Sequence, residues 1–211
     1  MQLIKPEEIT ETQKKVAKFT SYTDEEVAII QKQVFKDSKA SELGYFLKLS
    51  QSLGLNPFNK EIWAYKDAQS NVVIFAGRDG LLRKAQESPL FCGMSSSDVC
   101  ENDKIEIDIP NGIVEHKINP IQPRGKIVGA YAIVRRANET PVVVYRSIDE
   151  YDRNNNIWNK YKPDMITKVV EGKALKKAFG FSGVAVEGDM ESTKEGIIDV
   201  EHEDISNDFK E

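Results

Sequence analysis

The chain has 211 residues, 40% of them hydrophobic and 30% charged, and its formal net charge is −5. These values are ordinary for a soluble globular protein of one sizeable domain, and no apolar run reaches the ~20 residues that a membrane-spanning helix needs. The first residues lack the charged and apolar regions of a signal peptide, so we expect a cytoplasmic protein.

The charge is strongly segregated along the chain. Residues 117–177 hold 13 basic and 6 acidic side chains, whereas residues 178–211 hold 2 basic and 10 acidic ones. A basic segment of this kind favours nucleic-acid binding, although the isoelectric point of the whole chain is near 5.3. Residues 187–211 are acidic with few aromatic residues, and we predict a disordered tail there.

Two helices are predicted before residue 55. Thr23 and Glu26 form a capping-box pattern, and apolar residues at helical spacing extend the first helix to about residue 37. Ser41 is the expected cap of the second helix. Gly54 suits the position after its end, where a left-handed backbone is common.

From residue 61 the apolar period changes from that of a helix to that of a strand. After the Asn56-Pro57 pair, which stops the helix, two β-rich runs at 61–65 and 72–76 predict a hairpin. The later elements expected are a short helix at 81–87, one or two strands at 99–109, a hairpin at 128–136 and 142–146, and a helix from about 164 to 179.

The sequence offers little for covalent catalysis. It contains neither the Gly-rich loop that cradles a triphosphate nor the Gly-x-Ser-x-Gly turn of serine hydrolases. A zinc site made of Cys92, Cys100 and His116 would lack a fourth ligand, and a disulfide is disfavoured in the cytosol, so we interpret both cysteines as ordinary thiols. The carboxylates at 98–108 could serve a two-metal nuclease, but a solvated strand face explains them better. We therefore expect no catalytic residue, metal or cofactor.

The last predicted helix carries lysines on one side. At 100° per residue, Lys168, Lys173, Lys176 and Lys177 fall within one half of its circumference, and apolar residues such as Leu175 occupy the other half. Further basic residues precede it: Arg124, Lys126, Arg135, Arg136, Arg146, Arg153, Lys160 and Lys162. Aromatic residues are interleaved with them: Tyr131, Tyr145, Tyr151, Trp158 and Tyr161. Proteins that bind single-stranded nucleic acids combine cations that contact phosphates with aromatic rings that stack on bases. The alternative interpretation is that the lysines form only a solvated surface.

Five sequence blocks occur in the same order as in one known family. They are GLNPFNKEIWAY at 54–65, GRDG at 77–80, FCGM at 91–94, WNKYKP at 158–163 and KALKKAFGFSG at 173–183. These blocks resemble those of the Bet/RecT family of phage single-strand annealing proteins, including its GLNPxxKEIYA signature. Each block is weak alone, but together they cover about residues 43–183, and the chain is identified as a member. Trp63 replaces the usual tyrosine, and Lys162 stands where the family has histidine.

The resemblance implies an α+β fold, with helices packed around a small antiparallel sheet with hairpins and a basic groove that binds DNA. It implies a core at 23–186, preceded by a segment, 1–22, that contacts neighbouring protomers and followed by the acidic tail at 187–211. Family members bind single-stranded DNA, anneal complementary strands without ATP in phage-type homologous recombination, and assemble into rings or helical filaments. They work beside a 5′→3′ exonuclease and contact the host single-strand binding protein. Here the tail replaces the family's partner-binding domain, which leaves direct exonuclease contact open.

The resemblance places DNA contacts on Lys60, Lys173 and Lys176, with Lys162 and Lys168 aligned less directly. The full predicted DNA-binding set is Lys60, Arg124, Lys126, Arg135, Arg136, Arg146, Trp158, Lys160, Lys162, Lys168, Lys173, Lys176 and Lys177. Two other classes stay open at this stage, a plain single-strand binding module and a Mg²⁺-dependent nuclease.

Overall fold

A computed structural model describes residues 9–151 and 156–186 of the chain. Three helices form its N-terminal part: α1 (Glu11–Lys18), α2 (Asp24–Gln33) and α3 (Ala40–Leu53). The capping box predicted at Thr23 is confirmed, because the Glu26 N–H donates to Thr23 Oγ1 at 3.2 Å and the Thr23 N–H donates to Glu26 Oε2 at 2.8 Å. Such paired caps satisfy backbone donors that a helix start leaves without intrahelical partners.

The helix boundaries differ from the sequence expectations in several places. α2 ends at Gln33, before the expected residue 37. The prediction that Ser41 caps α3 is wrong, because the cap is Lys39, whose N–H donates to the Glu42 carboxylate at 2.6 Å. Gly54 ends α3 with φ +63°, as predicted. α1 has no counterpart among the predicted elements, since its apolar pattern is too short to indicate a helix.

A small sheet follows the third helix. Its strands are β1 (Ile62–Lys66), β2 (Val72–Ala76) and β8 (Ala185–Val186), in the order β1-β2-β8. The predicted hairpin is confirmed, with Ile62 opposite Ala76 in an antiparallel register. β8 pairs in parallel with β2, and a strand of two residues has no period from which it could be predicted.

The second sheet contains longer strands. They are β3 (Phe91–Cys100), β6 (Ile127–Arg136) and β7 (Val142–Ser147), antiparallel in the order β3-β6-β7, and a separate hairpin joins β4 (Lys104–Asp108) to β5 (Ile113–Lys117). The predicted hairpin of β6 and β7 is confirmed. The strand pattern at 99–109 divides into the end of β3 and all of β4. β3 begins earlier than the sequence predicted. Its first part was not predicted because the serines at 95–97 interrupt the alternation of apolar residues that indicates a strand.

Two helices lie between the sheets, α4 (Arg78–Gln86) and α5 (Asn156–Phe179). α5 starts before the predicted residue 164 and is broken at Tyr161, where φ is −130° and ψ is 37°. Pro163 explains a break here, because it has no backbone donor and disfavours helical conformation before it. Gly180 follows the helix with φ +67°.

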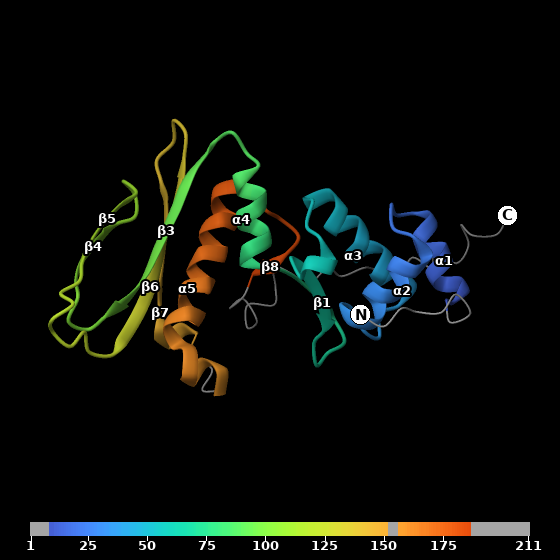
Figure 1. The fold of residues 1–211 in the computed structure, drawn as a ribbon, viewed down its shortest axis with the longest axis horizontal. Coiled ribbons are helices and arrows are strands. Elements are labelled where there is room, and N and C mark those ends of the chain that lie inside the picture. Colours follow the sequence, from blue (N-terminus) through green and yellow to red (C-terminus); the bar gives the residue numbers. More distant parts are fainter. Residues whose placement is uncertain (1–8, 152–155, 187–211) are drawn as a thin grey trace.

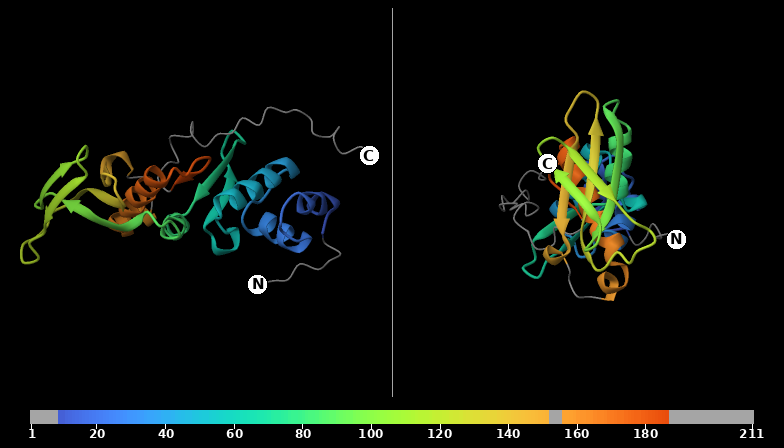
Figure 2. Two further views of the ribbon diagram at one scale, coloured as in Figure 1. Left: turned by 90° about the horizontal axis from the view of Figure 1, so that it is seen from above. Right: turned by 90° about the vertical axis from the view of Figure 1, so that its left-hand side faces the viewer.

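The elements are arranged along an elongated molecule (Figures 1 and 2). The three N-terminal helices occupy one end, the β4–β5 hairpin occupies the other, and α4 and α5 lie side by side between the two larger sheets (Figure 1). One cluster of buried residues joins α3, both of these sheets, α4 and α5; it includes Phe46, Ile74, Leu81, Val134 and Leu175. This shared core fixes the loop after α3 relative to α5.

The fold class α+β is confirmed, with five α-helices in the described residues. The strands form three small sheets and not the one expected, because α4 and the distal hairpin separate the β-rich runs. The basic groove stays a prediction. Val16 and Ala17 of the N-terminal segment are buried in the shared core. The acidic tail lies outside the described residues. None of the helices within 9–151 and 156–186 has the length and apolar character that crossing a membrane requires.

Candidate nucleic-acid interface

The loop between α3 and β1 presents one exposed lysine, Lys60. Asn56 Oδ1 accepts the Phe58 N–H at 2.9 Å and thereby starts a 3-10 turn, η2 (Pro57–Asn59). Lys60 closes this turn with φ +57°. A left-handed conformation costs about 1 kcal/mol for a residue with a Cβ, so the surrounding contacts must impose it. The side chain of Lys60 therefore leaves the protein from a fixed backbone position.

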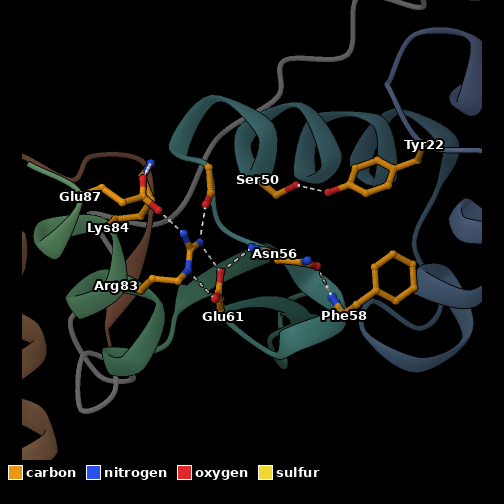
Figure 3. Close-up of polar contacts among 9 residues, drawn as sticks. Tyr22, Ser50, Asn56, Phe58, Glu61, Arg83, Lys84 and Glu87 are labelled. Carbon is orange, nitrogen blue, oxygen red and sulfur yellow. Dashed lines mark hydrogen bonds and ion pairs between the residues drawn. The ribbon is translucent and has the colours of Figure 1, made fainter.

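A buried carboxylate holds the loop from inside. Glu61 is 8% exposed, and Arg83 of α4 donates to both of its oxygens, from Nε to Oε1 at 2.7 Å and from Nη2 to Oε2 at 2.6 Å (Figure 3). The Asn56 N–H also donates to Oε2 at 2.8 Å. The hydrogen bond from Arg83 lowers the pKa of the Glu61 carboxyl, with further lowering by the Asn56 N–H, so the group is charged at neutral pH.

Arg83 connects three segments. Besides Glu61, its Nη2 donates to the backbone oxygen of Gly54 at 2.7 Å, which satisfies one of the carbonyls at the end of α3. Its Nη1 contacts the carboxylate of Glu87, the residue that ends α4, and Lys84 contacts the same carboxylate. The guanidinium is thus engaged through all three of its nitrogens (Figure 3).

Two glycines let α4 approach the loop this closely. A Cβ at Gly80 would lie 2.6 Å from the Cβ of Glu61, and one at Gly77 would lie 3.2 Å from the Lys60 carbonyl oxygen. Real Cβ atoms essentially never make a contact as short as the one at Gly80, and the contact at Gly77 would be unusually tight, so the GRDG block packs closely on the signature block because it lacks side chains at these two positions. Sequence reasoning did not identify Glu61 or Arg83 as site residues. The available signal was the pair of glycines, Gly77 and Gly80, directly before the helix predicted at 81–87.

A second buried carboxylate joins α4 to α5. Glu171 of α5 is 7% exposed, and Ser96 Oγ of β3 donates to its Oε1 at 2.5 Å. Arg78 Nε, at the start of α4, lies 3.3 Å from Glu171 Oε2. α4 therefore carries two arginines directed at buried acids, one toward the loop and one toward α5.

The lysines of α5 are less uniformly exposed than predicted. Lys177 is exposed, whereas Lys168, Lys173 and Lys176 are half-buried. Val169 is 1% exposed although its angular position lies within the lysine half of the helix. The reason is that α5 packs against the second sheet on one side and against α4 on another, which buries more than half of its circumference. The division into one basic and one apolar half is therefore only partly correct.

The arginines of the second sheet differ in how their charge is used. Arg135 is exposed and donates to Ser95 Oγ at 2.9 Å. Arg136 is half-buried, donates to the backbone oxygen of Ala178 at 2.8 Å, pairs with Glu139 and lies over the ring of Phe179. Arg146 donates to its neighbour's carbonyl at 2.8 Å and lies 3.9 Å from Glu150. Of the three, Arg135 is the most available to a ligand.

Arg124 is committed to acids at the base of the β4–β5 hairpin. Its Nη2 donates to Asp103 Oδ2 at 2.6 Å, its Nε donates to Asp103 Oδ1 at 3.0 Å, and its Nη1 donates to Asp98 Oδ2 at 2.9 Å. His116 Nε2 lies 3.2 Å from the same Asp103 Oδ2. The hydrogen bond from Arg124 holds the pKa of the Asp103 carboxyl far below its usual value. These contacts leave Arg124 little freedom to bind DNA.

The start of α5 contains the remaining predicted residues. Trp158 is 4% exposed and belongs to the shared core, so its ring does not offer the stacking surface expected of it. Lys160 is exposed, with its ammonium 5.2 Å from the centre of the Tyr161 ring, and Lys162 is half-buried. Lys126, just before β6, is exposed.

Cys92, Cys100 and His116, which were considered for a metal site, do not belong to any group of metal ligands in the part of the chain that the structure describes. Cys92 is exposed and Cys100 is buried, and both are free thiols. No group of three or more His, Cys, Asp or Glu side chains within that part could hold a metal ion.

Comparison with known proteins settles the family. Residues 20–204 match the model of the RecT family. The chain belongs to the RecT family. The match includes all five blocks that carried the resemblance, which is thereby confirmed, and membership implies phage-type DNA recombination by single-strand annealing. No curated protein matches the chain.

Proposed function

We propose that this RecT-family protein binds single-stranded DNA through its phosphates and anneals complementary strands without ATP or covalent catalysis. The observation that carries the proposal is the family match over residues 20–204. The exposed cations of the described residues supply the chemistry, since an annealing protein must neutralise two phosphate backbones while it leaves base edges free to pair.

The cations best placed for phosphate contact are those that are exposed. In the predicted set these are Lys60, Lys126, Arg135, Lys160 and Lys177. The half-buried lysines of α5 add to them, because a lysine can extend its ammonium group from a buried stem; they are Lys162, Lys168, Lys173 and Lys176. Arg124 is left out of the proposed site because it is bound to carboxylates, and Trp158 is left out because it is buried.

Assembly on DNA strengthens such contacts. Side-by-side protomers on one strand convert each further contact into an intramolecular event, so that weak phosphate contacts add up. We propose a homo-oligomer, a ring or helical filament, with residues 1–22 taking part in contacts between protomers. A 5′→3′ exonuclease and the host single-strand binding protein are proposed partners in phage-infected or prophage-carrying bacteria.

An annealing assay without ATP tests the proposal. Two complementary oligonucleotides, one with a fluorophore and one with a quencher, should form duplex faster with the protein than in buffer. A protein that protects single strands without accelerating pairing would be a plain binding module. Degradation of the labelled strand in Mg²⁺ would indicate a nuclease.

The salt dependence tests the phosphate chemistry. If each protomer engages ~4–6 phosphates, log affinity should fall with log salt at about −0.7 per phosphate. A flat salt response would contradict binding through phosphates.

A further inference from the structure

Arg83 and Lys60 are both basic and belong to neighbouring parts of the fold, but their surroundings differ. Lys60 is exposed, whereas the Arg83 guanidinium is engaged by Glu61, Gly54 and Glu87. A phosphate could reach Arg83 only in competition with two carboxylates. The Arg83 side chain is 41% exposed, but its guanidinium is committed to hydrogen bonds within the protein.

The residue that Arg83 binds is the direct neighbour of Lys60. Glu61 accepts from Arg83 and from the Asn56 N–H, so the two ends of the 3-10 turn are held to one carboxylate. Lys60 lies between them, with its N–H donating to the Pro57 oxygen at 3.1 Å and its φ at +57°. A planar fork that binds two carboxylate oxygens fixes orientation in a way that a point charge does not.

We propose that Arg83 is a positioning residue that acts through Glu61 to direct Lys60 at a DNA phosphate, and is not itself a phosphate ligand. This inference rests on the proposed function, because it assigns the task of one cation within the same DNA-binding surface. The proposal gives the two basic residues different tasks. Lys60 contacts DNA, and Arg83 holds the Lys60 backbone in position.

The affinity for a single-stranded oligonucleotide, measured over a series of salt concentrations, tests the assignment in five variants. K60Q should lower the slope of log affinity against log salt by about 0.7, the loss of one phosphate contact. R83K keeps the charge but loses the two-point grip on Glu61, and it should lower the slope by a similar amount. The double variant K60Q/R83K should lose no more than either single one.

Glu61→Gln gives the sharpest contrast. It removes a negative charge, so electrostatics alone, or a direct Arg83–phosphate contact, would tighten DNA binding. Positioning requires weaker binding, because the neutral amide no longer binds the guanidinium fork through two charged oxygens. Lys84→Gln is the matched control: it removes a cation from the adjacent position of the same helix without touching Glu61, and it should leave the slope unchanged.

Folding is followed by thermal denaturation and circular dichroism, and binding is compared well below the lowest melting temperature. A wild-type slope in R83K, additive losses in K60Q/R83K, tighter binding by E61Q, or an unchanged slope in K60Q overturns the assignment. A wild-type protein that does not bind or anneal DNA overturns the proposed function instead. The two failures are therefore distinguishable.

Discussion

Two arginine–carboxylate pairs in different parts of the molecule use the same geometry. Arg83 grips Glu61 beside the exposed Lys60, and Arg124 grips Asp103 at the base of the distal hairpin. Both acids are almost fully shielded, with side chains 9% and 2% exposed. An exposed lysine adjoins each acid, Lys60 before Glu61 and Lys104 after Asp103, but only Lys60 belongs to the predicted DNA-binding set. The position of a basic residue in the sequence thus says less about DNA binding than the acids that the fold brings to it.

The largest expected effect is a loss of stability when the Arg124–Asp103 pair is broken. Arg124→Gln leaves Asp103 buried without its main partner, and we expect a loss of about 3 kcal/mol in the free energy of unfolding. The salt slope of DNA binding should not change, because the guanidinium is bound to Asp98 and Asp103. Urea denaturation and oligonucleotide titration measure the two quantities. A reduced slope with unchanged stability would make Arg124 a phosphate ligand and break the comparison.

Removing charge from α5 tests the cations that we propose bind phosphate. The double variant K173Q/K176Q should reduce the salt slope by about 1.4, for two phosphate contacts. Affinity should fall alike for every oligonucleotide sequence, because phosphates carry no sequence information. Fluorescence anisotropy with several unrelated oligonucleotides gives the measurement. A loss confined to one sequence would show that base edges are being read.

Acid tests the stability that the Asp103 carboxylate contributes. Arg124 holds the pKa of Asp103 far below its ordinary value near 4, so the stability from this pair is complete above about pH 4 and is lost as the pH falls toward the lowered pKa. The pKa of Glu61 is lowered in the same sense by Arg83. Urea unfolding between pH 2 and 5 should therefore show a smaller acid-induced loss in Asp103→Asn than in wild type. Equal losses in the two proteins would place the acid sensitivity elsewhere.

The smallest effect concerns the acidic C-terminal segment. Ending the chain after Gly188 removes 9 acidic and 2 basic side chains, and competition between this segment and DNA for the same cations would then cease. We expect a few-fold tighter binding at low salt that disappears at high salt. The full chain and the shortened chain are compared in one titration series. Equal affinity would assign the segment to solubility or to a partner.

Local sequence patterns predicted the parts of the fold that short-range chemistry determines. The capping box at Thr23, the left-handed backbone of Gly54 and the two predicted hairpins, β1–β2 and β6–β7, follow from neighbouring residues. β8 could not be predicted, because its pairing with β2 joins segments about 110 residues apart. Likewise, β5 and the early start of β3 lack a clear alternation of apolar residues.

The candidate site shows the same limit. Lys60 and the α5 lysines could be named from residue type and resemblance. The partners of Arg83 and Arg124 lie 22 and 21 residues away in sequence, on other elements. The burial of Trp158 could not be predicted for the same reason, since it depends on elements that pack over it. Charge patterns predict which residues could bind DNA, and tertiary contacts decide which remain available.

The absent side chain at Gly80 has a consequence for protein engineering. Since a methyl group there would collide with Glu61, the signature block and α4, which begins within GRDG, have complementary shapes and cannot be exchanged singly. Chimeras with other family members should transplant residues 54–87 as one cassette. A junction placed between the two blocks would pair surfaces that were never matched.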